Sequence, residues 1–298
     1  MTAPDLNAFV DPNLVRDLIA WAMREDMGPD RLDITSELLV PADARATARM
    51  RARRGGRLAG AALLGQIAAA YDPAITVQTL KTDGANLERG DVVTTFTGPL
   101  RSILAMERVA LNFVTHLSGI ATLTARYVAA VEGTAAGIYD TRKTIPGFRG
   151  LAKYAVVCGG GHSHRMGLYD AVLVKDNHIA DIPLEQLADV VTRLIEDARR
   201  RNPAPNFIEI EVDRLDQLER VLPCSPDIVL LDNMDVPQLR EAVAMRNRLA
   251  PKVKLESSGG VTLETVRAIA ETGVDRIAIG ALTHSAPALD LGLDIEEA

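Results

Sequence analysis

A short stretch of this chain concentrates cationic side chains that could bind an anionic ligand. Between Thr141 and Lys175 there are six Lys and Arg residues and a single acid, Asp170, although the whole chain carries a formal net charge of −7. Such a run is often an ordinary solvated basic face. It can equally line a pocket, since arginine offers a planar fork to a carboxylate and lysine a point charge to a phosphate. The basic residues are Arg142, Lys143, Arg149, Lys153, Arg165 and Lys175.

Two carboxylates stand at the ends of apolar runs further along the chain. Glu211 lies in FIEIEVD and Asp232 in IVLLDN. Carboxylates that face a basic pocket can hold Mg²⁺, accept hydrogen bonds from sugar hydroxyls or stabilise a developing positive charge. They can also merely neutralise Lys175 and its neighbours. The residues alone leave these alternatives open.

Glycine-rich turns provide candidate sites for phosphate groups. ESSGG ends at Gly260 and IAIGA ends at Ala281, each directly after an apolar run. Backbone N–H groups in loops that follow the last strands of a barrel bind phosphate recurrently. The glycines of GGGHSHR at 159–165 are a weaker signal for an anion-binding loop. His162 and His164 in this motif could suggest a zinc site, but no third and fourth ligand stand at a suitable spacing. Neither a Walker A motif nor a GxGxxG after a strand is present.

The elements that must position these residues alternate between strand and helix. From about residue 136, six apolar runs end near residues 140, 175, 211, 232, 256 and 280, and segments 184–200 and 236–250 have the apolar spacing of surface helices. This alternation predicts parallel strands joined by right-handed crossovers, and six strands with room for one more favour a barrel. Five of the runs end on or beside a charged residue. The carboxyl ends of barrel strands converge on one pocket, so we expect an anion-binding site there.

The first 115 residues lack this alternation and predict a separate α+β domain. We expect a helix over 12–24, short strands within 44–64, 74–84 and 91–98, and a second helix that begins near Arg101. Within 107–131, Arg108, Asn112 and His116 share one helical face. Asn112 and His116 have many apolar neighbours and can be polar groups of the core, an interpretation that we favour for His116. Arg108 is a charge on an otherwise buried stripe, and such a charge usually needs an anion or an acid.

Composition narrows the class of protein. The chain has 298 residues, of which 47% are hydrophobic and 24% charged, as in ordinary globular proteins. No apolar run reaches the roughly 18 residues of a membrane helix, and the amino terminus does not read as a secretory signal. With Cys158 and Cys224 as the only cysteines, a disulfide framework is implausible and a reducing cytoplasm fits. The acidic balance disfavours a broad nucleic-acid surface.

Taken together, the motifs resemble the quinolinate phosphoribosyltransferase family, also called carboxylating nicotinate-nucleotide pyrophosphorylase. The resemblance covers most of residues 105–292, and its motifs are ERVALNFVTHLSGIAT, DTRKTIPGFR, HSHRMGLYDAVLVKDNHI, IEIEVD, LLDN, ESSGG, IAIGALT and APALDLGL. The family implies an amino-terminal α/β sandwich domain (1–116, joined by the tail 286–298) and an incomplete, seven-stranded α/β barrel (117–285). It also implies a homodimer, and the sequence does not decide whether dimers assemble further into a hexamer.

The resemblance implies a reaction and assigns residues to it. Quinolinate and phosphoribosyl pyrophosphate combine with Mg²⁺ as cofactor to give nicotinate mononucleotide, CO₂ and pyrophosphate, a step of NAD biosynthesis. The residues that match the quinolinate carboxylate site are Arg142, His164, Arg165 and Lys175, with Arg108 similar to an arginine that reaches into the partner subunit's pocket. The positions that handle pyrophosphate, Mg²⁺ and ribose are matched by Thr141, Lys143, Glu211 and Asp232. The 5′-phosphate loops are matched by Ser258, Gly259, Gly260, Ile279, Gly280, Ala281 and His284.

One segment departs from the family pattern, and other functions remain as alternatives. EDMGPDRLDIT at 25–35 is longer than the usual ED…GDIT-like stretch, which leaves the local loop structure open. A related protein of the same fold could act on another substrate, as those associated with molybdenum transport do, although the full cation set argues against this. A non-catalytic binder of phosphorylated metabolites would leave the acid pair without a purpose. A nucleic-acid binder is the least expected.

Overall fold

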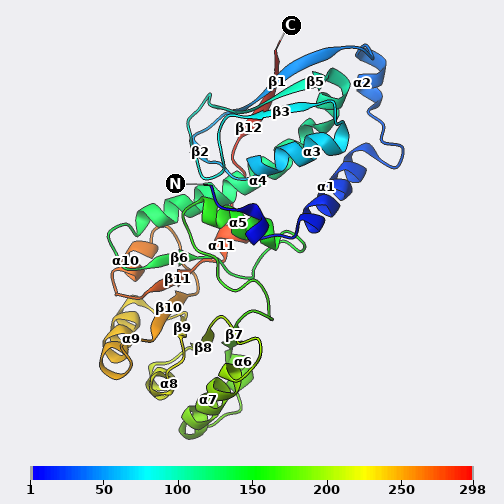
Figure 1. Cartoon of the computed structure of the whole chain (residues 1–298). Coiled ribbons are helices and arrows are strands. Elements are labelled where there is room, and N and C mark those ends of the chain that lie inside the picture. The colour runs from blue at the N-terminus through cyan, green and yellow to red at the C-terminus, as the bar shows by residue number, and fades with distance from the viewer. Residues whose placement is uncertain (1–2, 297–298) are drawn as a thin grey trace. The chain divides into compact units, whose positions relative to one another are not determined.

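The chain divides into two compact units in this computed structural model, which describes residues 3–296 (Figure 1). The first unit contains the chain up to Ala125, Ile145–Gly160 and the chain from Leu282 onward. The second contains Arg126–Thr144 and Gly161–Ala281. Each unit therefore draws on segments that are far apart in the sequence.

The second unit is built on a parallel sheet of six strands in the order β6-β11-β10-β9-β8-β7. All six predicted strands are present, as β6 (Gly137–Tyr139), β7 (Val172–Val174), β8 (Ile208–Val212), β9 (Ile228–Asp232), β10 (Lys254–Ser258) and β11 (Arg276–Ala278). Beyond β6, His162 adds one isolated parallel bridge to Tyr139. Since no ladder among residues 3–296 joins β6 to β7, the barrel is incomplete.

Helices connect these parallel strands and cover the sheet. The helices predicted over 184–200 and 236–250 are confirmed as α7 (Leu184–Arg199) and α9 (Val236–Leu249). Helix α7 buries Leu187, Val191 and Ile195 at intervals of four, which is the spacing of one helical face. The remaining helices of the connections are α6 (Asp176–Ile179), α8 (Leu215–Val221) and α10 (Val266–Ala270). Because every strand runs the same way, the residues that follow the strands gather at one edge.

The first unit contains an antiparallel sheet in the order β12-β1-β5-β3. Its strands are β1 (Arg45–Ala52), β3 (Thr76–Thr79), β5 (Val92–Pro99) and β12 (Leu291–Glu296), and a small ladder joins β2 (Gly56–Arg57) to β4 (Asn86–Leu87). The helices are α1 (Pro12–Met27), α2 (Ile34–Leu39), α3 (Leu64–Tyr71), α4 (Leu100–Ala130), α5 (Arg149–Cys158) and, at the unit boundary, α11 (Ala281–His284). Of the helices that the structure describes, none is long and apolar enough to cross a membrane.

The longer segment at 25–35 forms a tight connection between two helices. Helix α1 ends at Gly28, which adopts a positive φ of 70°. The side chain of Asp33 then accepts a hydrogen bond from the Ser36 backbone and begins α2. The additional residues are thus accommodated in a turn outside the parallel sheet.

Helix α5 is held in the first unit by a buried acid. The Tyr154 hydroxyl donates to Asp83 Oδ2 at 2.6 Å, and the Asp83 carboxylate also accepts from the backbone N–H groups of Ala61 and Ala62. Burial, followed by the charge of Asp83, raises the pKa of Tyr154 far above its ordinary value, so the hydroxyl keeps its proton. This contact joins the loop at Asp83 to the helix that follows residues 140–149.

Replacing Tyr154 with phenylalanine is expected to lower the free energy of unfolding by about 1–3 kcal/mol, because the buried Asp83 carboxylate loses a donor. The exposed Tyr169 provides the matched control, since its side chain is 83% exposed and Tyr169→Phe removes the same atom. Thermal unfolding of both variants measures the difference. Equal melting temperatures for the two variants would contradict the role of this hydrogen bond.

Candidate active site

A cavity of about 560 Å³ lies at the carboxyl ends of the parallel strands in the second unit. Sequence-predicted site residues that line it are Thr141, Arg142, Lys143, His164, Arg165, Lys175, Glu211, Asp232, Ser258, Gly259 and Gly260. The other lining residues are Leu173, Leu230, Asn233, Glu256 and Ala278. The fold therefore brings together side chains that are spread over more than a third of the chain.

A larger cavity, of about 730 Å³, opens at the amino ends of the same strands. It is lined by the first residues of strands and by preceding loops, among them Phe207, Asp227 and Lys254. The cation, acid and glycine motifs singled out from the sequence lie instead at the carboxyl ends, where barrel enzymes carry out their chemistry. We therefore assign the candidate active site to the carboxyl-end cavity.

Four of the six basic residues between Thr141 and Lys175 line this cavity, whereas Arg149 and Lys153 belong to α5 in the other unit. Within the loop after β6, the Lys143 backbone N–H donates to Thr141 Oγ1 at 3.0 Å. This local hydrogen bond shapes the turn from which Arg142 and Lys143 project.

The two guanidinium groups of the cavity are close and poorly solvated. Arg165 is only 6% exposed, and burial, followed by the positive charge of Arg142, lowers its pKa. Arg142 Nε is buried without a hydrogen-bond partner among the described residues. Glu209, Asp170 and Glu211 act on Arg165 in the opposite direction but leave its pKa lowered. Two neighbouring cations with little access to water favour a negatively charged ligand between them.

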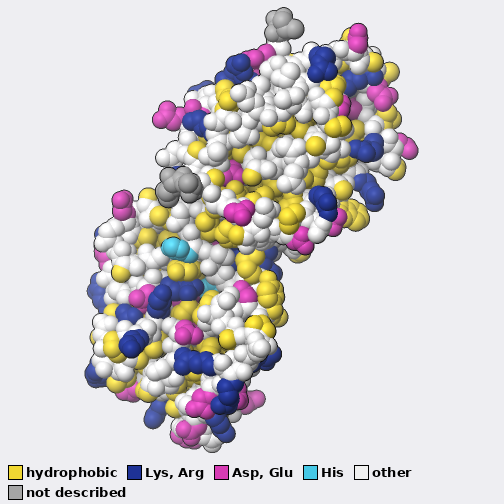
Figure 2. Space-filling model, in the orientation of Figure 1, with side chains coloured by type: hydrophobic (Ala, Val, Ile, Leu, Met, Phe, Trp, Pro, Cys, Tyr) yellow, Lys and Arg dark blue, Asp and Glu magenta, His cyan; other side chains and the backbone are white. Residues whose placement is uncertain are grey.

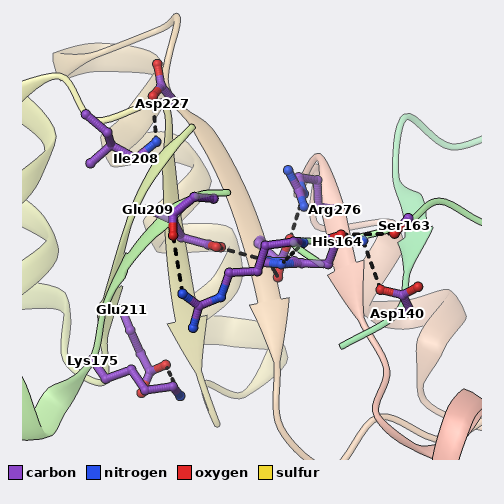
Figure 3. Close-up of polar contacts among 12 residues, drawn as sticks. Asp140, Ser163, His164, Lys175, Ile208, Glu209, Glu211, Asp227 and Arg276 are labelled. Carbon is purple, nitrogen blue, oxygen red and sulfur yellow. Dashed lines mark hydrogen bonds and ion pairs between the residues drawn. The ribbon is translucent and has the colours of Figure 1, made fainter. Parts of the chain in front are cut away.

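The acid side of the cavity is formed by the ends of β8 and β9. Lys175 Nζ lies 2.9 Å from Glu211 Oε2 (Figure 3), and Asp232 Oδ2 accepts a hydrogen bond from Asn233 Nδ2 at 2.7 Å. Glu211 therefore neutralises Lys175, which is one of the alternatives that the sequence left open. The Asp232 carboxylate is oriented by an amide instead, and both acids remain at the cavity wall.

The glycine loop after β10 approaches the end of β9 closely. The Asn233 backbone N–H donates to Ser258 O at 2.9 Å, and Gly259 has a φ of +100°. A Cβ at position 259 would lie 3.0 Å from the Asn233 backbone nitrogen and closer still to its side chain. Only glycine therefore combines this backbone conformation with this approach. Helix α10 begins later, at Val266, so the loop offers backbone groups rather than a helix end.

Beneath the cavity, His164 lies in a cluster of buried charged residues that the sequence interpretation did not identify as a unit (Figure 3). His164 Nε2 lies 3.0 Å from Glu209 Oε2 and 3.3 Å from Glu256 Oε1. Arg276 Nε lies 2.6 Å from Glu256 Oε2, and its guanidinium covers the Tyr139 ring at 3.8 Å. One signal was available, because Glu209 and Glu211 are two residues apart and so share one face of β8.

This cluster is better described as a set of ion pairs than as a metal centre. The ligand atoms of His164, Glu209 and Glu256 lie within 4.8 Å of one another, which a metal ion could bridge. The same atoms already contact one another, and the Arg276 cation adds positive charge beside them. His162 does not join them, since its ring stacks on Tyr139 at 4.9 Å.

Other sequence-predicted residues lie apart from the cavity lining. Arg108 and His284 belong to the first unit, and the His284 ring lies 2.6 Å from Ser285 Oγ. Arg108 is exposed on α4, so the expectation that it sits on an otherwise buried stripe was wrong. Asp140 is buried and accepts from the His164 backbone N–H at 2.9 Å, which anchors the loop. Residues 279–281 directly follow the lining residue Ala278.

The helical face that carries Arg108 contains the two other polar residues considered from the sequence. Asn112 is exposed, so it is not one of the polar groups of the core. His116 is half-buried and packs edge-on against Phe148 with ring centroids 5.3 Å apart. Burial lowers the pKa of His116, as expected for a neutral imidazole in packing contact.

Comparison with known proteins agrees with this architecture. Two domain models of one family match the chain: "Quinolinate phosphoribosyl transferase, N-terminal domain" over residues 33–118 and "Quinolinate phosphoribosyl transferase, C-terminal domain" over residues 120–294. The nicotinate-nucleotide pyrophosphorylase (carboxylating) of Mycobacterium leprae (strain TN) is 45% identical over 288 residues, which are 94% of this chain and 96% of that protein. The quinolinate phosphoribosyltransferase (decarboxylating) 1b of Nicotiana tabacum is 37% identical over 95% of this chain and 82% of its own length.

A solved structure extends the similarity to the whole fold. Nicotinate-nucleotide pyrophosphorylase from Francisella tularensis has a TM-score of 0.88 at 35% identity, and the match covers 99% of this chain and 100% of that one. Sequence and structure comparisons therefore agree across both units. The chain belongs to the quinolinate phosphoribosyltransferase family.

Proposed function

We propose that this protein transfers the phosphoribosyl group of phosphoribosyl pyrophosphate to the ring nitrogen of quinolinate, with loss of the 2-carboxylate as CO₂. The observation that carries the proposal is a single cavity lined both by the half-buried Arg142 and the buried Arg165 and by the carboxylates of Glu211 and Asp232. The cationic residues suit a dicarboxylate, and the acidic residues suit a phosphorylated sugar. The names of the relatives from Mycobacterium leprae and Nicotiana tabacum agree with this reaction.

Quinolinate has two adjacent carboxylates, which suit the cationic half of the cavity. Arg142 and Arg165 offer planar donor forks, and the Lys175 ammonium adds a mobile point charge. Binding of a carboxylate would release Lys175 from its ion pair with Glu211. These contacts would hold the ring so that its nitrogen faces the ribose carbon, which supplies the positional part of catalysis.

The phosphoribosyl donor suits the opposite half. We assign its 5′-phosphate to the backbone N–H groups of Ser258–Gly260, with residues 279–281 next to them, and its ribose hydroxyls to Glu211 and Asp232. Lys143, which is exposed beside Arg142, would neutralise the pyrophosphate. The close approach of Gly259 to Asn233 keeps the loop in the shape that this binding needs.

Replacing Gly259 with alanine is expected to lower kcat/KM for phosphoribosyl pyrophosphate by about 10- to 100-fold, since a Cβ there forces the loop away from Asn233 and adds about 1–2 kcal/mol of backbone strain. Gly133→Ala is the matched control, because Gly133 has a similar φ of +79° in the same unit but open space around it. Steady-state kinetics with each substrate varied separately measure the effect. Equal losses in the two variants would show that strain alone, and not the loop position, is responsible.

The acid pair fits the Mg²⁺ that the family implies. Glu211 and Asp232 present hard oxygen ligands at the cavity wall, and Mg²⁺ is usually held by one or two carboxylates together with substrate phosphates and waters. When bound, Mg²⁺ would offset the negative charge of the pyrophosphate. This assignment predicts that chelation with EDTA abolishes turnover without unfolding the protein.

The proposed steps conserve atoms and electrons. The bond between the ribose carbon and the pyrophosphate oxygen breaks, and the quinolinate nitrogen lone pair forms the new bond to that carbon. The Glu211 and Asp232 carboxylates stabilise the positive charge that develops on the ribose. The bond to the 2-carboxylate then breaks, its electron pair passes to the ring carbon beside the cationic nitrogen, CO₂ leaves, and that carbon takes a proton from solvent.

We also propose that a second copy of the chain completes the site through Arg108. This arginine is exposed on α4, where it is free to reach another subunit. Figure 2 shows yellow, apolar areas on the surface of the first unit. Exposed apolar side chains on this unit offer an interface of the kind that monomers rarely leave uncovered. They include Trp21, Leu32, Ile34, Leu38 and Leu39.

The function is tested by mixing the protein with phosphoribosyl pyrophosphate, Mg²⁺ and either quinolinate or nicotinate. Nicotinate mononucleotide that forms from quinolinate and not from nicotinate is the expected result. Product from nicotinate alone would refute the decarboxylating reaction. Binding of phosphoribosyl pyrophosphate without product from either acid would favour the rival that acts on another substrate.

A further inference from the structure

The larger cavity of the second unit, of about 730 Å³, lies at the amino ends of the parallel strands and is called the amino-end cavity below. Its volume is within the range of small-molecule sites, which is about 300–1,000 Å³. All of its lining residues belong to the second unit, so it is formed within one compact body. Barrel enzymes carry out their chemistry at the carboxyl ends of the strands, so this cavity has no part in the proposed reaction.

The alternation of side chains along a strand explains which residues reach this cavity. Phe207 and Lys254 stand two residues before Glu209 and Glu256, so they share the inner face of the sheet with these acids. Arg276 is the partner of Glu256 in the register between β10 and β11. The interior of a parallel barrel is filled mainly by branched apolar side chains. Two cations at this end of the interior are therefore not explained by packing.

Arg276 is a nearly buried cation with unused donors at the cavity wall. It is 7% exposed, and its Nε lies 2.6 Å from Glu256 Oε2 while the guanidinium covers the Tyr139 ring. Most N–H donors of a guanidinium belong to the two terminal Nη atoms. No residue in the range 3–296 accepts a hydrogen bond from either Nη of Arg276. Glu256 thus compensates the charge, and the terminal donors are available to a ligand in the cavity that Arg276 lines.

Two lysines add positive charge at the rim of the amino-end cavity. Lys252 and Lys254 are exposed lining residues, and neither forms an ion pair within the part of the chain that the structure describes. Asp227 is the only acid among the described lining residues. Its Oδ2 accepts from the Ile208 backbone N–H at 2.7 Å (Figure 3), and its Oδ1 lies 3.7 Å from Arg199 Nη2. The cavity therefore carries an excess of positive charge.

The remainder of the wall is mainly apolar. Phe207 is half-buried, Leu249 at the end of α9 is 39% exposed, and Ile228 is buried. The Arg276 guanidinium carbon lies 5.5 Å from the centre of the Phe207 ring, so the apolar and cationic parts of the wall adjoin each other. Apolar walls with a few convergent polar groups are the usual form of a small-molecule site.

From these observations we infer that the amino-end cavity binds a small molecule that combines an apolar ring with one anionic group. The ring packs against Phe207 and Leu249, and the anionic group accepts hydrogen bonds from Arg276 and from the lysines at the rim. The inference goes beyond the proposed function and does not depend on it, since none of the residues assigned to quinolinate or phosphoribosyl pyrophosphate lines this cavity.

Calorimetric titration of the whole protein with 1-naphthalenesulfonate tests the inference, because this probe carries both a ring and an anionic group. It should bind at least about tenfold more tightly than 1-naphthalenesulfonamide, which has the same ring and no charge. Inorganic sulfate, which has the charge and no ring, should also bind at least about tenfold more weakly than the probe. Equal affinity for the sulfonate and the sulfonamide would overturn the inference.

Removing the lysines at the rim locates the bound probe. The Lys252→Ala/Lys254→Ala protein should bind the sulfonate about tenfold more weakly, while its affinity for the sulfonamide changes less than about twofold. Arg240→Ala is the matched control, since it removes an exposed cation of α9 that lies outside the cavity lining, and it should change neither affinity. Unchanged sulfonate binding in the double lysine variant, or a loss in Arg142→Ala instead, would contradict the inference.

Replacement of Leu249 gives a second test, which also serves if the double lysine variant fails to fold. Leu249→Ser should weaken binding of the sulfonate and the sulfonamide alike by about fivefold, because both rings lose an apolar contact. Leu38→Ser is the matched control, since Leu38 is 78% exposed on the first unit, and it should weaken neither. Weaker binding in Leu38→Ser and not in Leu249→Ser would place the probe on the first unit and overturn the inference.

Discussion

Replacing Arg142 with alanine is expected to lower kcat/KM for quinolinate by about 100-fold or more, because truncating one member of a buried charge pair typically costs about 2–5 kcal/mol. Arg142 projects from the loop after β6, and its Nε is buried without a hydrogen-bond partner among the described residues. Its charge also lowers the pKa of Arg165, so we expect one substrate carboxylate to compensate both guanidinium groups. The KM for phosphoribosyl pyrophosphate should change less than about threefold, since the site proposed for its 5′-phosphate is the separate loop Ser258–Gly260.

Arg142→Lys is the control for this prediction. Lysine keeps the charge but loses the planar fork, so the loss should be intermediate. Calorimetric titration with quinolinate measures binding separately from turnover. An Arg142→Ala protein that binds quinolinate as tightly as the wild type would contradict the carboxylate role of this residue.

The second large effect is expected from mixing two inactive variants. Arg108→Ala and Lys175→Ala should each lose nearly all activity, since each removes a cation from the proposed quinolinate site. In a mixed dimer, the Arg108→Ala barrel would receive Arg108 from the Lys175→Ala copy. One intact site therefore forms in each mixed dimer, and random pairing of equal amounts should restore about a quarter of wild-type activity.

Co-expression with two different affinity tags, followed by sequential purification, isolates the mixed dimer. A preparation of pure mixed dimer should then reach about half of wild-type activity, with one of two sites intact. The control is the Arg108→Ala/Lys175→Ala double variant co-expressed with wild type, in which an intact and a doubly defective chain are paired. No recovery in the mixed dimer would show that Arg108 serves its own subunit or none.

The charged residues at the strand ends could be predicted because each of them interrupts an apolar run in the sequence. Lys175, Glu211 and Asp232 each close a run, and parallel strands carry them to one cavity. The charge run by itself did not separate Arg149 and Lys153 from the cavity residues, because it does not reveal that a helix, α5, begins at Arg149 and packs in the other unit. Composition of a segment constrains its charge and not the direction in which each side chain points.

Longer-range pairing was harder to predict. Glu209 and Arg276 belong to strands, and their partners His164 and Glu256 are tens of residues away, so only the folded sheet shows that the charges compensate one another. Arg108 was assigned to a buried stripe because its helix is rich in apolar residues on several faces. The structure leaves that face exposed, which local spacing cannot reveal.

The most direct measurement follows the 2-carboxylate of quinolinate. Quinolinate labelled with carbon-14 at that carboxylate is mixed with the protein, Mg²⁺ and phosphoribosyl pyrophosphate, and trapped CO₂ is compared with nicotinate mononucleotide. We predict one labelled CO₂ for each nucleotide formed and none when phosphoribosyl pyrophosphate is omitted. Label that stays in the nucleotide, or CO₂ released without the phosphoribosyl donor, would contradict the proposed reaction.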